Sequence, residues 1–186
     1  MALVPYISPD ELAEDYQPLL ARPINLFRAF ANSPDALAQF HPFGEWIRWE
    51  CQLDGRQREL LILQVGYLTA DPYEWSHHVE IAQRFGVTEA DIDGLVAVTA
   101  GGQAPTLSAQ DRLLLVAARE LTVQRRLNDD TAQALIDQFG NARFTDVVVV
   151  VAFYNMVVRV LGGLRVDVEP EYQSYLERFP LGPAAV

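Results

Sequence analysis

The chain is organised around residues 59–78, which read ELLILQVGYLTADPYEWSHH. Four groups that can bind a ligand or move a proton lie at fixed intervals there: Glu59, Asp71, Glu74 and His78. On a helix that begins after Asp71, Glu74 and His78 share one face, with about 5–6 Å between their Cβ atoms. Most of the residues between these groups are apolar. We therefore expect a partly dry site, where burial moves carboxyl and imidazole pKa values toward neutrality.

Length and composition narrow the class of protein. The 186 residues suffice for one domain with a real core, and half of them are apolar. The formal net charge of −11 argues against a nucleic-acid surface and against an anionic membrane surface. Cys51 is the only cysteine, so an intrachain disulfide and dithiol chemistry within one subunit are impossible. The first residues lack the pattern of a secretion signal, and we expect a cytoplasmic protein.

Helical patterns cover most of the sequence. The apolar spacing from Arg56 to Thr69 predicts a largely buried helix, and Asp71-Pro72 then starts a helix that stops before Gly86. In the leader, a helix that starts at Ser33-Pro34 is expected to end at His41-Pro42. No strand–turn–strand signature is found, so the predicted fold class is all-α. Further helices are expected at 88–98, 108–121, 128–139, 145–161 and 172–177.

The most apolar segment is Val147–Leu164. Its five consecutive valines favour a strand by propensity, but its length and its lack of turn signals favour a helix. It is barely long enough to span a membrane and contains Asn155 and Arg159. We therefore interpret it as a buried central helix. Tyr154 within it either lines a pocket or is a hydrogen-bonded core tyrosine.

Each candidate group also has a structural interpretation. Asp71 is well placed as an N-cap, with Pro at the first helical position and Glu74 at the third. Glu59 could be a solvated carboxylate beside an arginine, but the apolar residues after it favour a buried group. His78 gains an orienting partner in Glu74. His77 lies about 100° around the helix from His78, so we expect it at the surface or at a subunit contact.

Other kinds of site receive less support from the sequence. Glu-x-x-x-His can chelate a metal, but the usual helical pairs His-x-x-x-His and Glu-x-x-His do not occur here. We therefore predict no metal and no cofactor. A Gly-x-Ser-x-Gly nucleophile elbow and a phosphate-binding glycine loop are also absent from the sequence.

The spacing of the four groups resembles a known signature. Glu, Cys twelve residues later, Cys three later and His four later is the motif of AhpD-type alkylhydroperoxidases, members of the carboxymuconolactone decarboxylase superfamily. Glu59 and His78 keep the outer places here, while Asp71 and Glu74 stand where the cysteines would be. The flanking sequences, RELL before the motif and YEWSHHVEIA within and after it, look like the cysteine-free, decarboxylase-like branch. The resemblance covers about residues 45–165.

This resemblance implies an all-α, multihelical AhpD-like bundle with an internal duplication of helical units. It divides the single-domain chain into a helical leader (1–44), a decarboxylase-like domain (45–165) and a C-terminal tail (166–186). The leader is expected to pack on the core or on a neighbouring subunit. Together with that aromatic leader, the resemblance implies a homo-oligomer, a trimer or hexamer.

The function implied is that of a cofactor-independent, carboxy-lyase-like enzyme, which acts by acid–base chemistry on a small carboxylated or lactone-like substrate. Two alternatives stay open: a non-catalytic ligand-binding or scaffold protein of the same fold, and an AhpD-type peroxidase, which the loss of both motif cysteines disfavours. Three residues are expected to be catalytic (Glu59, Glu74 and His78) and four to bind the substrate (Arg58, Asp71, Trp75 and Tyr154).

Overall fold

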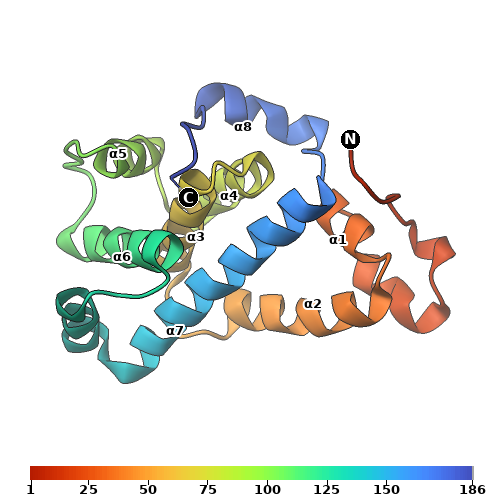
Figure 1. Ribbon diagram of the computed structural model, residues 1–186, viewed down its shortest axis with the longest axis horizontal. Coiled ribbons are helices and arrows are strands. Elements are labelled where there is room, and N and C mark those ends of the chain that lie inside the picture. The colour runs from red at the N-terminus through yellow and green to blue at the C-terminus, as the bar shows by residue number, and fades with distance from the viewer. Residues whose placement is uncertain (186) are drawn as a thin grey trace.

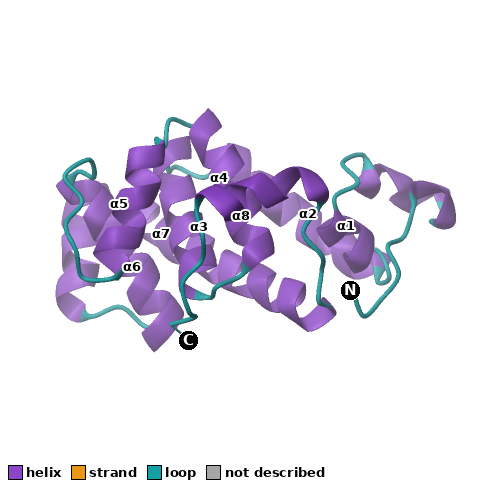
Figure 2. Ribbon diagram, turned by 90° about the horizontal axis from the view of Figure 1, so that it is seen from above, coloured by secondary structure: helices purple, strands orange, loops and turns teal. Residues whose placement is uncertain are grey.

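The computed structural model describes residues 1–185, and within them the chain forms helices and no strand (Figures 1 and 2). The predicted all-α class is therefore confirmed. The α-helices are α1 (Asn25–Phe30), α2 (Pro34–Trp49), α3 (Gly55–Leu68), α4 (Pro72–Arg84), α5 (Glu89–Thr99), α6 (Ala109–Arg119), α7 (Asp129–Leu164) and α8 (Gln173–Arg178). Shorter turns of 3₁₀ helix lie at Pro9–Glu11, Glu14–Leu20 and Pro170–Tyr172, and a π-helical turn lies at Glu120–Gln124.

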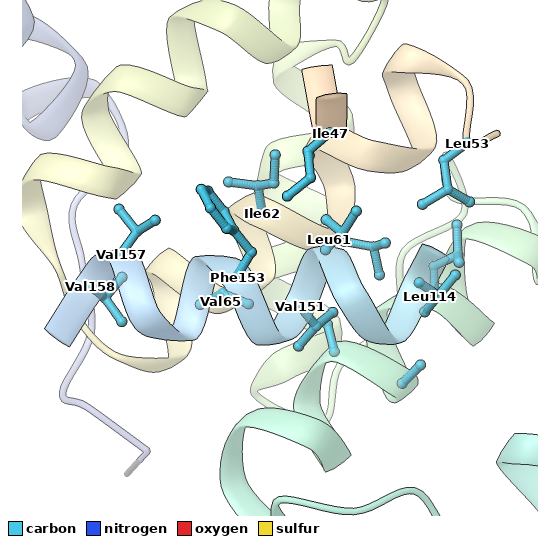
Figure 3. Packing of buried hydrophobic residues seen from close by; sticks show 14 of the residues in the cluster. Ile47, Leu53, Leu61, Ile62, Val65, Leu114, Val151, Phe153, Val157 and Val158 are labelled. Atoms are coloured by element: carbon cyan, nitrogen blue, oxygen red, sulfur yellow. The ribbon is translucent and has the colours of Figure 1, made fainter. Parts of the chain in front are cut away.

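Helix α3 is the centre of the fold and packs against α4, α6 and α7. It is buried on both sides, as the almost continuous apolar run predicts. Leu61, Ile62 and Val65 belong to the hydrophobic core shared with α7 (Figure 3). Leu60 and Leu63 belong to a second core shared with α4 and α5. Polar groups on α3 are therefore enclosed unless they face a cavity.

Helix α7 runs diagonally across the molecule in Figure 1. Its backbone is non-helical at Gly140 (φ 74°, ψ 166°), where the sequence predicts a stop, so two helical segments meet there at a kink. The second segment is the predicted central helix, with Val151 and Phe153 in the core (Figure 3). By length and composition alone α7 could cross a membrane. Its packing against α3 and α6 agrees with a core helix.

The leader differs from the prediction at His41-Pro42. Helix α2 does not end there but continues through Pro42 to Trp49. Proline removes one helical hydrogen bond, and aromatic packing on both sides of it compensates. The Phe40 and Phe43 rings lie 5.0 and 5.2 Å from that of Phe153. Because α2 is continuous, it crosses the expected boundary between leader and domain at residue 44.

The leader packs on the core at one end of the molecule, opposite α5 and α6 (Figures 1 and 2). It holds a small hydrophobic cluster of its own around Leu20, Ala31 and Leu37. Phe43 and Trp49 stay exposed (45% and 65%). Contact of these rings with a neighbouring subunit, and with it the homo-oligomer, stays a prediction.

Candidate active site

Helices α3 and α4 carry the candidate site and cross closely. A Cβ atom added to Gly66 would lie 3.2 Å from the backbone nitrogen of Trp75 and 3.4 Å from its Cα. Any larger residue at position 66 would therefore push the two helices apart. Ala70 reverses the chain between them in the left-handed conformation (φ 49°). This tight connection brings the α3 and α4 side chains of the motif together.

A buried set of hydrogen bonds runs from Arg58 through Glu59 to His78. Arg58 donates to Oε1 of Glu59 from Nε (3.1 Å) and from Nη2 (3.0 Å). The other oxygen of Glu59 lies 2.7 Å from Nδ1 of His78. Because Glu59 is held by a guanidinium it is an acceptor, so Nδ1 of His78 is the donor. This contact fixes the imidazole ring and turns Nε2 toward Glu74.

Glu74 is the least satisfied group of the site. Its Oε1 lies 3.1 Å from Nε2 of His78, as the four-residue spacing predicts. The two atoms are close but poorly aligned, and this oxygen is a buried side-chain atom without a hydrogen-bond partner among residues 1–185. Burying an ionised carboxylate without a partner is costly. The Glu74 carboxyl is therefore poised to hold a proton or to bind a ligand.

The pKa values of Glu74 and His78 agree with that geometry. Burial raises the pKa of Glu74 to about 7; His78 opposes this shift, while Asp71 and Glu59 add to it. Burial disfavours the charged form of His78, but the carboxylates of Glu74 and Glu59 outweigh it and raise the pKa of His78. The two groups titrate as a pair, and Glu74 can exchange a proton near neutral pH.

Glu59, Glu74 and His78 line a cavity of about 90 Å³ between α3, α4, α7 and the leader. This volume is enough for several waters or a small organic molecule. Its apolar wall is largely aromatic and includes Phe27, Phe40 and Phe153. Helix α2 adds a polar wall, with Arg48 one of its members. The cavity thus combines a flat apolar lining with a few polar groups, as small-molecule sites do.

Tyr154 supplies a neutral hydroxyl to the same cavity. Its ring meets that of His78 edge-on, with 5.2 Å between centroids. Burial, followed by the charges of Glu74 and Glu59, raises the pKa of Tyr154 well above its ordinary value, while Arg48 acts in the opposite direction. No described residue within 1–185 accepts a hydrogen bond from this hydroxyl. Tyr154 is therefore a protonated donor that is available to a ligand.

The structure brings five of the seven predicted site residues to this cavity: Arg58, Glu59, Glu74, His78 and Tyr154. Asp71 and Trp75 do not line it. The Asp71 carboxylate accepts from the Glu74 backbone N–H at 2.9 Å and caps α4. Trp75 is fully buried in the core on the α5 side, and its Nε1 donates to the Phe179 carbonyl at 2.8 Å. Both positions correct the expected substrate contacts, because helix capping and core packing occupy these side chains.

Sequence reasoning missed the contribution of α2. His41, Gly44, Glu45 and Arg48 all line the cavity from α2. Their spacing of three, four and seven residues places them on one helix face. That signal is present in the sequence, but the break predicted at His41-Pro42 hid it. The leader is thus part of the site and not only a cover for the core.

His77 is buried, contrary to its expected surface position. Its ring stacks between those of Tyr73 and Tyr172, with centroid distances of 4.1 and 3.6 Å. Nε2 of His77 lies 2.8 Å from Oε2 of Glu169. Burial lowers the pKa of His77, and Glu169 acts in the opposite direction. The C-terminal segment explains the difference, because it covers a helix face that the α4 sequence alone would leave exposed.

Comparison with known families agrees with this arrangement. The model of the carboxymuconolactone decarboxylase family (CMD) matches residues 34–115. The resemblance to the carboxymuconolactone decarboxylase/AhpD-like superfamily is confirmed. The matched segment begins at the first residue of α2 and contains Glu59, Glu74 and His78. The cavity wall formed by α2 thus lies inside the CMD segment, while Tyr154 lies beyond it.

Solved structures share the AhpD-like fold over most of the chain. An uncharacterized peroxidase-related protein from Ralstonia eutropha JMP134, described as an alkylhydroperoxidase AhpD core, has a TM-score of 0.78 at 17% identity, covering 97% of this chain and 98% of its own. An uncharacterized peroxidase-related protein from Silicibacter sp. TM1040 has a TM-score of 0.74 at 21% identity, with coverages of 91% and 92%. A search of curated proteins found no match.

A third structure is the debrominase Bmp8, a cysteine-to-alanine variant in complex with 2,3,4-tribromopyrrole. It has a TM-score of 0.73 at 14% identity and covers 96% of this chain and 100% of its own. At such identities the likeness extends to the fold and not to the reaction. In the present chain Cys51 does not line the cavity; its thiol contacts the Ile47 carbonyl at 3.0 Å, and burial raises its pKa.

Proposed function

We propose that this CMD-type protein is a cofactor-independent enzyme that transfers a proton to carbon in a small carboxylated or lactone-like substrate. Decarboxylation or a related lyase or isomerase step is the reaction class. The observation that carries the proposal is the buried, unpartnered Glu74 carboxyl beside His78, in a cavity of substrate size. A carboxyl with a pKa of about 7 is an effective general acid at neutral pH.

The electron pair released by decarboxylation must be held by the substrate itself. The sequence contains no lysine, so a lysine imine cannot act as the electron sink. When the bond to the departing carbon dioxide breaks, its electron pair moves into an adjacent carbonyl and forms an enolate. The Tyr154 hydroxyl would donate to that enolate oxygen, since a neutral preorganised donor stabilises charge as it develops.

Glu74 would then deliver its proton to the carbon that lost the carboxylate, and the enolate would return to a carbonyl. The Nε2 proton of an imidazolium at His78 could reprotonate Glu74 after a small rotation, because the two atoms are 3.1 Å apart. Glu59 stabilises the imidazolium through Nδ1, and Arg58 balances the charge of Glu59. A neutral Glu74 also removes one source of repulsion for an anionic substrate.

The test is a turnover assay of the purified protein on 4-carboxymuconolactone and a panel of related lactones and β-keto acids. Run in deuterium oxide, the product should carry deuterium at the protonated carbon. Glu74→Gln should lower kcat by about 10²- to 10⁴-fold, the usual contribution of a general acid. The matched control is Glu80→Gln on the same helix, where the carboxylate pairs with Arg84 outside the cavity.

Equal turnover of Glu74→Gln and the unmodified protein would refute the assignment of Glu74 as the general acid. Absence of turnover across the whole panel, with tight binding of a panel member, would favour the non-catalytic ligand-binding alternative. Turnover of an organic hydroperoxide that disappears in Cys51→Ser would instead support the peroxidase alternative.

A further inference from the structure

Arg48 is the one arginine of α2, and it lines the cavity together with Arg22 and Arg58. No carboxylate of residues 1–185 lies within ion-pairing distance (4.0 Å) of its guanidinium. The guanidinium packs 5.5 Å from the ring centre of Trp49. Its own backbone carbonyl accepts a hydrogen bond from Nη1 of Arg58 at 2.6 Å, which anchors α2 to α3 at this point. The backbone of Arg48 is thus held in place, while its guanidinium has no carboxylate partner among residues 1–185.

The surrounding charges leave Arg48 free to act on a ligand. Arg58 is committed to Glu59 through two hydrogen bonds. Glu45, one turn before Arg48, accepts from Nε1 of Trp49 at 3.0 Å and is exposed. Arg48, His78 and Tyr154 line the same cavity. The charge of Arg48 acts to lower the pKa of both His78 and Tyr154.

Space is available on the same helix face. Gly44 lines the cavity one turn before Arg48. A Cβ atom at this position would meet only Phe153, at an ordinary contact distance of 3.6 Å, so packing alone does not demand glycine there. The absence of a side chain instead leaves room between Arg48 and the aromatic wall. A planar, negatively charged molecule could fill that room and stack on the wall.

We propose that Arg48 binds a carboxylate of the substrate and so selects small planar anions, with α2 completing the site. This inference rests on the proposed function of the same cavity. A carboxylate held by a guanidinium is stabilised as a charged ground state, which disfavours its loss as carbon dioxide. The anchored carboxylate is therefore retained, and the reacting carbon lies elsewhere on the substrate, toward Glu74 and Tyr154. The preferred substrate thus carries a second functional group besides the carboxylate that Arg48 holds.

Two probes of matched shape, benzoate and benzamide, test this inference without turnover. Their dissociation constants are measured by calorimetry at about pH 6, where Glu74 is largely protonated. We expect benzoate to bind about 10- to 100-fold more tightly than benzamide, the factor that a charge-assisted hydrogen bond provides. Arg48→Gln should abolish that preference and leave benzamide binding unchanged. Arg126→Gln, which removes the same charge from an exposed site, should keep it.

Equal affinities of the two probes for the unmodified protein, or a preference that survives Arg48→Gln, would overturn the inference. Failure of benzoate to bind would overturn it as well. Glu74→Gln separates this inference from the proposed function, because it should lower kcat by about 10²- to 10⁴-fold and retain the preference for benzoate. A preference for benzoate in a protein that turns over no substrate would support the Arg48 site and count against the proposed enzyme.

Discussion

At the scale of single residues, the buried carboxyl of Glu74 couples the site to folding. It is 3% exposed, and its pKa is about 7 against an ordinary value of 4.5. Between these two pH values the folded state binds more protons than the unfolded state, so the free energy of unfolding falls as the pH rises. His78 acts in the same direction, because its raised pKa stabilises the fold below pH 6.5 and that contribution is lost as the pH rises.

We therefore predict that Glu74→Gln flattens the dependence of stability on pH. The unmodified protein should lose on the order of 3 kcal/mol through this carboxyl between about pH 4.5 and pH 7, while the variant retains that stability. Urea unfolding across this range measures the difference. Glu80→Gln should keep the slope of the unmodified protein. Parallel slopes for Glu74→Gln and the unmodified protein would show that Glu74 is ionised throughout.

The proposed catalytic groups could be found from the sequence for two different reasons. Glu74 and His78 lie on one helix, so their spacing alone predicts the contact. The contact between Glu59 and His78 joins two helices, and only the resemblance to a known motif indicated it. The partnerless state of Arg48 could not be predicted at all, because it depends on where every carboxylate near it lies.

At the scale of elements, the N-terminus of α4 positions Glu74, the proposed general acid. The Asp71 carboxylate accepts a hydrogen bond from the backbone N–H of Glu74 and so fixes the first turn of the helix. Asp71→Ala should lower the free energy of unfolding by about 1 kcal/mol, the usual cost of a lost N-cap. It should also lower the pKa of Glu74, because Asp71 is one of the charges that raise it.

Thr88→Ala is the matched control, since it removes the N-cap of α5, far from the motif. Both variants should lose similar stability in urea unfolding, but only Asp71→Ala should shift the pH dependence of kcat to lower values. A shift of the same size in Thr88→Ala would mean that general loosening, and not the Asp71 charge, is responsible.

Most helix ends were predictable because their signals are local. Thr88 and Ser108 with their capping boxes, and Gly86 with φ 85°, act within a few residues of the chain. The helix end predicted at Pro42 was wrong for the opposite reason, since the Phe40 and Phe43 rings beside it contact Phe153, more than a hundred residues away. The π-helical turn at Glu120–Gln124 lies beside a contact of shorter range, in which Glu120 accepts from the backbone N–H of Asn128 at 2.8 Å.

At the scale of the whole molecule, the C-terminal segment fastens the leader to the core. One oxygen of Glu169 accepts from the backbone N–H of Asn25 (2.7 Å) and from the Tyr73 hydroxyl (2.9 Å). Its other oxygen meets His77. Burial acts to raise the pKa of Glu169, but the hydrogen bonds from these partners, chiefly His77, outweigh that effect and lower the pKa. The stability that this carboxylate contributes is present above its ordinary pKa and is lost as the pH falls through the lowered value.

We predict that Glu169→Gln loosens the leader. Loss of the charged acceptor should cost about 1–3 kcal/mol of stability and increase cleavage of the first fifty residues in limited proteolysis. Glu171→Gln, at an exposed neighbouring position, should behave like the unmodified protein. Because the leader continues into α2, which carries Arg48, the Glu169 variant should also bind benzoate more weakly. An unchanged cleavage pattern would show that apolar packing alone holds the leader.

The most direct test of the central claim is the protonation state of Glu74 itself. Carbon-13 NMR of glutamate labelled at the side-chain carboxyl would follow all glutamates from about pH 4 to about pH 9. We predict one resonance that titrates at about pH 7 and is missing from Glu74→Gln. If every glutamate resonance titrates near the ordinary value of about 4.5, Glu74 is ionised at neutral pH and cannot be the proton donor.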